Sequence, residues 1–72
     1  MDRKGKLTNR LAVLRAERRW SQKKVAELLG ISRQTVISME ANRYSPSLIL
    51  AFQIAQLFSK DINDVFQYEE DV

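Results

Sequence analysis

The stretch that decides the fold of this chain is QKKVAELLGISRQTVISMEAN, residues 22–42. Its pattern predicts two short helices, one over residues 22–29 and one over residues 33–41, joined by the turn Gly30-Ile31-Ser32. Ser21 and Ser32 precede these helices, and serine is a favoured N-cap because its hydroxyl accepts a hydrogen bond from an unpaired N–H of the first turn. Gly30 suits the left-handed conformation in which many helices end.

The residue types inside this stretch also fit close packing of the two helices. Ala26 is small where the helices must cross, and Val36 is apolar and β-branched where the second helix packs on the first. A side chain at Gly30 would cost about 1 kcal/mol in the turn. The remaining inner positions are also apolar: Val25, Ile31 and Met39. Together, these features at this spacing predict a helix-turn-helix.

The rest of the chain also has the pattern of helices. Three leucines at helical spacing predict a first helix over about residues 8–18: Leu7, Leu11 and Leu14. A helix over about residues 48–58 and a short last helix follow, with Ser47 and Asp61 as their N-caps. Because glycine and proline are scarce and no alternating strand pattern is present, the expected fold class is all-α, a compact five-helix bundle.

Length bounds the domain organisation. The 72 residues allow one domain, in which we expect a core over about residues 8–66 and an acidic, frayed tail over residues 67–72. Trp20, which precedes an N-cap, is expected to pack as a hydrophobic staple against Val25 or Leu28.

Composition excludes most classes of enzyme. The chain has neither cysteine nor histidine, so disulfides, thiolate or imidazole metal sites and the usual hydrolytic triads are excluded. We therefore expect no catalytic residue, no metal and no cofactor. No apolar run reaches the ~20 residues needed to span a bilayer, and the N-terminus lacks the apolar segment of a signal peptide. The sequence thus predicts a soluble, cytoplasmic protein.

Charge is distributed unevenly along the chain. The net charge is +3, from 12 Lys and Arg against 9 Asp and Glu. Residues 1–24 carry nine basic and two acidic residues, a net charge of +7, whereas residues 45–72 carry one basic and five acidic residues, a net charge of −4. A basic first half favours a polyanionic partner such as nucleic acid.

Three motifs in the chain resemble those of a known family. They are L-x-x-L-R at residues 11–15, S-Q-x-x-V-A-x-x-L-G-I-S-R-Q-T-V-x-x-M-E at residues 21–40, and N-R-Y-x-P-S-L at residues 42–48. Over residues 8–68 the chain is similar to the Cro/cI-type (Xre-family) DNA-binding domain. This resemblance implies a lambda-repressor-like bundle whose third helix, over residues 33–41, enters the major groove of double-stranded DNA.

The start of this third helix carries the candidate base-reading residues. Arginine pairs with guanine O6 and N7, and glutamine with adenine N6 and N7, so Arg33 and Gln34 are the first candidates. They match the positions that the resembling family uses for base contacts. Further candidates for contact with a base edge or a phosphate are Thr35, Ser38 and Ser32.

A second group of residues is expected to contact the DNA backbone. The resemblance implies phosphate contacts for Gln22, at the start of a helix, and for Arg43, after the end of the recognition helix. Additional phosphate contacts, which set affinity and salt dependence, are expected from Lys23, Lys24 and Arg10. The resemblance also implies a partly buried ion pair between Arg15 and Glu40.

The C-terminal third of the chain contains the candidate dimer interface. Ile49 replaces a residue that is usually polar in the family. An apolar side chain on a solvent-exposed face of a helix indicates contact with another chain. The other candidates are Phe52 and Gln53 near Ile49, and Ile62, Val65, Phe66 and Tyr68 toward the C-terminus. The alternative for Ile62, Val65 and Phe66 is that they complete the core.

Together these features predict a sequence-specific transcriptional regulator, a repressor that binds a palindromic operator as a homodimer and is nucleoid-associated when bound. No small-molecule ligand is expected. The alternative is a protein-binding adaptor, or an antitoxin-like partner protein, that keeps the helix-turn-helix fold. The basic first half and the long polar side chains of Arg33 and Gln34 favour DNA binding.

Overall fold

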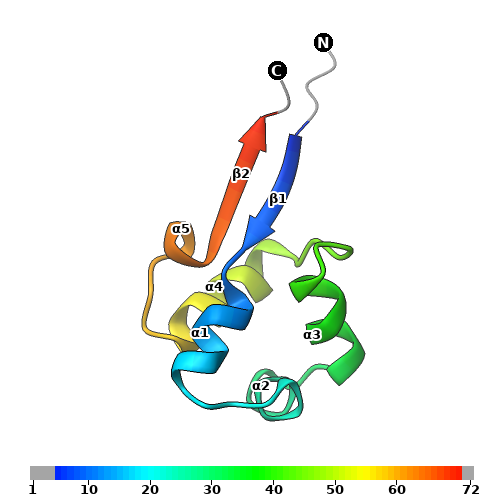
Figure 1. Ribbon diagram of the computed structural model, residues 1–72, viewed down its shortest axis with the longest axis vertical. Coiled ribbons are helices and arrows are strands. Elements are labelled where there is room, and N and C mark those ends of the chain that lie inside the picture. Colours follow the sequence, from blue (N-terminus) through cyan, green and yellow to red (C-terminus); the bar gives the residue numbers. More distant parts are fainter. Residues whose placement is uncertain (1–4, 71–72) are drawn as a thin grey trace.

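The computed structural model describes residues 5–70, which form a small helical body and a two-stranded antiparallel sheet (Figure 1). In chain order the elements are β1 (Gly5–Asn9), α1 (Leu11–Glu17), α2 (Gln22–Leu29), α3 (Arg33–Glu40), α4 (Leu48–Leu57), α5 (Ile62–Val65) and β2 (Phe66–Glu70). The two strands form a ribbon that projects from the helical body (Figure 1). No helix in the described part of the chain has the length and apolar character required to cross a membrane.

The helix-turn-helix of α2 and α3 forms where the sequence predicts it, because its capping signals are local. Ser21 Oγ accepts a hydrogen bond from the N–H of Lys24 at 2.9 Å, and Ser32 Oγ accepts one from the N–H of Thr35 at 3.1 Å. Gly30 ends α2 with a φ of 70°, in the left-handed region where glycine avoids the steric cost of a Cβ. The bounds of α2 match the prediction, and α3 ends one residue earlier than predicted.

The core is one cluster of apolar side chains to which all five helices contribute. Its largest fully buried members are Leu11, Leu14, Val25, Val36, Met39, Ile54 and Val65. Trp20 packs at the edge of this cluster, with its ring centroid 5.5 Å from that of Phe58. The structure thus places the Trp20 ring against the end of α4, whereas the sequence predicts a local contact with Val25 or Leu28.

The ribbon of β1 and β2 corrects the all-α prediction. Five residue pairs join the two strands in antiparallel register. The first helix, predicted over residues 8–18, begins only at Leu11, while Leu7 and Thr8 lie in β1. Leu7 still packs against the core. Its spacing from Leu11 and Leu14 therefore identifies an inward-facing side chain correctly but does not establish a continuous helix.

The acidic tail, predicted to be frayed, is paired in the structure. Residues 67–70 belong to β2, whereas residues 71 and 72 lie outside the described part of the chain. The prediction failed because the partner strand lies at the opposite end of the sequence, where Lys6 is directly opposite Glu69. Such cross-strand pairs contribute a few tenths of a kcal/mol each and are invisible to local patterns.

Asn9 connects the ribbon to the helical body. Its Oδ1 accepts a hydrogen bond from the N–H of Leu11 at 3.0 Å, which satisfies an otherwise unpaired donor at the start of α1. Its Nδ2 donates to the backbone carbonyl of Met39 at 2.8 Å and to Asn42 Oδ1 at 3.1 Å. One side chain thus joins β1, α1 and the end of α3.

Candidate nucleic-acid interface

The start of α3 presents the predicted base-reading residues to solvent. Ser32, Arg33 and Gln34 are exposed, whereas Thr35 and Ser38 are half-buried. The opposite side of α3 is buried in the core, and this packing fixes which side of the helix faces outward. The exposed side therefore carries two long polar side chains, Arg33 and Gln34, that can reach a ligand lying along the helix.

Hydrogen bonds within α3 engage some of these side chains. Ser32 Oγ and Thr35 Oγ1 lie 2.7 Å apart and share a hydrogen bond. Gln34 Nε2 donates to Ser38 Oγ at 3.5 Å, which is long for a hydrogen bond and is readily exchanged for a contact with a ligand. Ser32 therefore serves first as the cap of α3, and Gln34 remains able to bind elsewhere.

A polar network ties α1, α2 and the end of α3 together. Arg15 Nε donates to Glu40 Oε2 at 2.8 Å and Arg15 Nη2 donates to Glu40 Oε1 at 3.1 Å, which makes a two-pronged ion pair. Arg15 Nη1 donates to the carbonyl of Trp20 at 3.0 Å, and Gln22 Nε2 donates to Glu40 Oε1 at 3.0 Å. The ion pair implied by the resemblance is present, and Gln22 braces α3 through it.

This network is partly shielded from solvent. The side chains of Arg15 and Glu40 are 21% and 10% exposed. The hydrogen bond that Arg15 donates to Glu40 raises the pKa of Arg15, against the lowering effect of burial. The hydrogen bonds of Arg15 therefore tie α1 to Glu40 at the end of α3.

A basic hollow is lined by residues of α1, the start of α2 and the first residue of α3. This α2–α3 hollow has a volume of about 570 Å³ and is lined by Arg15, Ser21, Gln22, Lys23 and Arg33. Three of these five side chains are cationic, and the unpaired N–H groups at the start of α2 add positive potential. The arrangement suits an anion such as a backbone phosphate.

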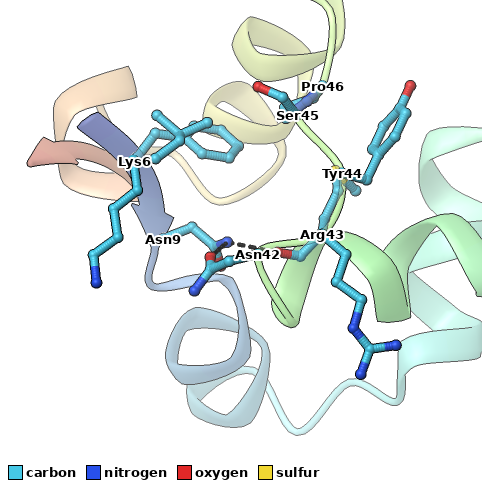
Figure 2. A pocket seen from close by; sticks show the side chains of 10 residues that line it. Lys6, Asn9, Asn42, Arg43, Tyr44, Ser45 and Pro46 are labelled. Atoms are coloured by element: carbon cyan, nitrogen blue, oxygen red, sulfur yellow. Dashed lines mark hydrogen bonds between the residues drawn. The ribbon is translucent and has the colours of Figure 1, made fainter. Parts of the chain in front are cut away.

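A second hollow lies at the other end of α3, between β1 and the α3–α4 loop (Figure 2). This ribbon–loop hollow has a volume of about 330 Å³. Lys6 and Arg43 extend on either side of the Asn9–Asn42 hydrogen bond (Figure 2). Its apolar lining includes Leu7, Met39 and Phe66. Two hollows that carry positive charge therefore lie beside α3.

The predicted phosphate contacts are divided between these hollows and the open surface. Gln22 and Lys23 line the α2–α3 hollow, and Arg43 lines the ribbon–loop hollow. Lys24 and Arg10 line neither of the two, and both are exposed. An exposed cation attracts a polyanion over a distance that salt screens to about 10 Å at 0.1 M ionic strength.

The predicted dimer residues divide between core and surface. Val65 is fully buried and Phe66 is 8% exposed, so both residues belong to the core, which is the alternative that the sequence left open for them. Ile62 is half-buried and packs against the same core. Exposed apolar surface gathers instead on α4, where the exposed fractions are 70%, 73% and 53% for Leu48, Ile49 and Phe52.

Two other dimer candidates are exposed. Gln53 follows Phe52 on α4, and Tyr68 of β2 is 61% exposed. The Tyr68 ring leans over Gly5, where an added Cβ would meet its hydroxyl, so the glycine leaves room for the ring. The apolar surface on α4 is therefore the larger exposed candidate, and Tyr68 belongs to the face of the ribbon.

Two residues of the ribbon–loop hollow, Lys6 and Asn9, have no place among the sequence-predicted site residues. Lys6 contributes to the basic first half, but no local motif distinguishes it, and the partners of Asn9 lie 30 and 33 residues away. Within residues 5–70, no group of three or more His, Cys, Asp or Glu side chains could hold a metal ion. The candidate interface consists of cations, amides and hydroxyls.

Comparison with known proteins assigns the family. The helix-turn-helix family model matches residues 11–65, from α1 to α5. An uncharacterized HTH-type transcriptional regulator of Methanocaldococcus jannaschii is 46% identical over 65 residues, which cover 90% of this chain and 98% of that protein. Another, from Bacillus subtilis, is 43% identical with the same coverage.

Solved structures agree with this assignment. A crystal structure of a protein from Bacteroides fragilis, provisionally described as DNA-binding, has a TM-score of 0.76 at 28% identity and covers 85% of this chain and 98% of that one. The transcriptional regulator VanUg, with a TM-score of 0.75 at 18% identity, shares the fold. The helix-turn-helix of α2 and α3 and the match to these relatives lead to one assignment. This chain belongs to the Cro/cI-type (Xre) helix-turn-helix family of transcriptional regulators, a DNA-binding family without enzymatic activity.

Proposed function

We propose that this protein is a sequence-specific reader of double-stranded DNA that represses transcription by occupying an operator. The observation that carries the proposal is the exposure of Arg33 and Gln34 at the start of a recognition helix that is braced by Arg15, Gln22 and Glu40. The Arg33 guanidinium can donate two hydrogen bonds to guanine O6 and N7, and the Gln34 amide can donate to N7 and accept from N6 of adenine, all in the major groove. A rigid support is what allows two side chains to discriminate between bases.

In this proposal the other candidates have supporting roles. Thr35, Ser38 and Ser32 contact base edges or phosphates next to the two main readers. Gln22 and Lys23 hold a phosphate in the α2–α3 hollow, Arg43 holds one at the far end of α3, and Lys24 and Arg10 add long-range attraction. These phosphate contacts set the position of α3 in the groove, and the base contacts set the sequence preference.

The test is selection of bound sequences from a random duplex pool at near-physiological salt. Arg33→Ala and Gln34→Ala are selected in parallel, with Lys60→Ala as a control because Lys60 is exposed at the end of α4, away from α3. We expect the wild type and the control to select the same consensus, and each α3 variant to relax it at specific positions. Each lost base contact lowers discrimination by about 1–3 kcal/mol.

Two outcomes would contradict the proposal. Binding that is salt-sensitive but selects no sequence would make the protein a nonspecific DNA-coating protein. A folded wild type that binds no duplex would instead favour the protein-binding adaptor or antitoxin-like alternative, for which the exposed apolar surface of α4 would be the partner site.

We also propose that the protein binds as a homodimer through α4. Leu48, Ile49 and Phe52 form its exposed apolar surface, with Gln53 beside them. A two-fold dimer presents two recognition helices to half-sites about one helical turn apart, which predicts a palindromic operator. Tyr68 lies on the ribbon and Ile62 against the core, so neither is part of this surface.

The dimer is tested by sedimentation equilibrium of the wild type, Ile49→Glu and Tyr68→Glu. We expect the wild type to have twice the 8.4 kDa mass of one chain, Ile49→Glu to have the mass of one chain, and Tyr68→Glu to remain a dimer. The reverse pattern would place the dimer contact on the ribbon. A monomeric wild type that selects only one half-site would refute dimerisation.

A further inference from the structure

We propose that the ribbon–loop hollow seats a backbone phosphate of bound DNA, with Lys6 of β1 as a cation that acts together with Arg43. The inference rests on the proposed DNA-binding function and extends it to a strand outside the helix-turn-helix. Lys6 lies outside the region matched by the family model, which starts at residue 11.

The position of the hollow is the first argument. The α2–α3 hollow includes Arg33, the first residue of α3, and the ribbon–loop hollow includes Asn42 and Arg43, just after its last residue. A helix in the major groove is bordered on both sides by phosphate backbone. With α3 in the groove, we expect one strand of the duplex to lie along the α2–α3 hollow and the other to lie along the ribbon–loop hollow.

The chemistry of the lining is the second argument. Lys6 and Arg43 are both exposed, and they extend on either side of Asn9 and Asn42 (Figure 2). Ser45 adds a hydroxyl to the wall. Two exposed cations with amide and hydroxyl groups between them suit the phosphate backbone, because phosphate oxygens accept charge-assisted hydrogen bonds.

The hydrogen bonds of Asn9 are the third argument, because they hold the two walls of the hollow together. Asn9 lies in β1, three residues after Lys6, and its Nδ2 donates to Met39 and Asn42 at the end of α3. The place of Lys6 is thus fixed relative to the recognition helix. Asn9 is a positioning residue in this proposal.

One acidic neighbour opposes the seat. Glu69 is directly opposite Lys6 in the ribbon, and directly paired residues of an antiparallel sheet share a face. We therefore expect the negative charge of Glu69 to weaken the attraction of DNA to this face. Removing the charge of Glu69 should therefore strengthen DNA binding, whereas removing the charge of Lys6 should weaken it.

The first experiment compares duplex binding by wild type, Lys6→Gln, Lys6→Arg, Glu69→Gln and the control Lys60→Gln over a range of salt concentrations. Lys60→Gln removes the same charge from an exposed site between α4 and α5. For one lost phosphate contact we expect Lys6→Gln to bind roughly 3–10-fold more weakly at 0.1 M salt, with a salt slope reduced by about 1. Lys6→Arg should bind like wild type, and Glu69→Gln more tightly.

The results distinguish this inference from the proposed function. If the wild type binds DNA and Lys6→Gln matches Lys60→Gln in affinity and slope, the phosphate seat is refuted and the function stands. If the wild type binds no DNA, both are refuted. We expect each variant to have the circular dichroism spectrum of the wild type. This measurement separates the loss of a DNA contact from the loss of folding.

A second experiment identifies the phosphate itself. Duplexes in which single phosphates are replaced by neutral methylphosphonates are bound by wild type and Lys6→Gln. We expect one position at which the replacement weakens wild type but not Lys6→Gln, because the contact is already absent. The side chain in Asn9→Asp can still accept a hydrogen bond from the N–H of Leu11 but cannot donate one to Met39. The methylphosphonate at that position should therefore weaken DNA binding by Asn9→Asp less than it weakens binding by wild type. Equal losses for all variants at every position would refute a direct contact.

Discussion

Arg15→Ala offers the sharpest test of how the recognition helix is supported. The substitution removes three hydrogen bonds and leaves Glu40, whose side chain is 10% exposed, with Gln22 as its remaining partner in the network. Breaking a fully buried ion pair costs about 3–5 kcal/mol. Because Arg15 is 21% exposed, solvent can partly replace the lost contacts, and we expect a loss of about 2–3 kcal/mol.

This loss is large for a chain of 72 residues, whose free energy of unfolding is about 4–11 kcal/mol at ordinary stability per residue. It corresponds to a fall in Tm of about 8–24 °C. The assay is urea denaturation followed by the fluorescence of Trp20, whose ring packs against Phe58. Arg43→Ala, which removes an exposed arginine, is the matched control and should change stability by less than about 0.5 kcal/mol.

Equal stability of Arg15→Ala and the control would refute the structural role of the network. DNA binding gives an independent check at a temperature where Arg15→Ala remains folded. There the variant should still bind more weakly than wild type, because α3 has lost the brace at its end. Wild-type affinity in a folded Arg15→Ala would show that the helix needs no such support.

Three further predictions concern stability. Gly30→Ala should lower stability by about 1 kcal/mol, because Gly30 has a φ of 70°, while an added Cβ would meet no other atom. An unchanged Tm would contradict this backbone strain. Arg19 has a φ of 55°, so Arg19→Gly should raise stability by about 1 kcal/mol, and a lower urea midpoint would count against it. Asn9→Ala should lower the free energy of unfolding by about 1–3 kcal/mol, because it leaves the Met39 carbonyl without this donor. The control Thr8→Ala, next to it in β1, should lower it less. Equal losses of stability in urea denaturation would show that the hydrogen bonds of Asn9 contribute little.

The parts of the fold that could be predicted are those set by neighbours in sequence. The caps Ser21 and Ser32 and the helix stop at Gly30 act within one helical turn, so a single sequence contains the whole signal. The same holds for the outward side of α3, because the apolar spacing of Val36 and Met39 determines which residues are left exposed.

The parts that could not be predicted depend on distant partners. Leu7 has the spacing of a helical residue, but pairing with Tyr68 places it in a strand. Trp20 packs on Phe58, which lies 38 residues later and has no local relation to it. Lys6 and Asn9 belong to the hollow only because the ribbon brings β1 to the end of α3. Helix propensity and apolar periodicity do not predict contacts between residues that are distant in sequence.

The ribbon also has a consequence for the order in which the chain folds. Its pairs join residues that are 57 positions apart at Asn9 and Phe66 and 65 apart at Gly5 and Glu70. Closing so large a loop costs entropy before any pairing returns it, so we expect the helical body to form first and to bring the strands together. During synthesis from the N-terminus, β1 therefore waits without its partner until β2 has left the ribosome, by which time α2 and α3 have already had the chance to dock.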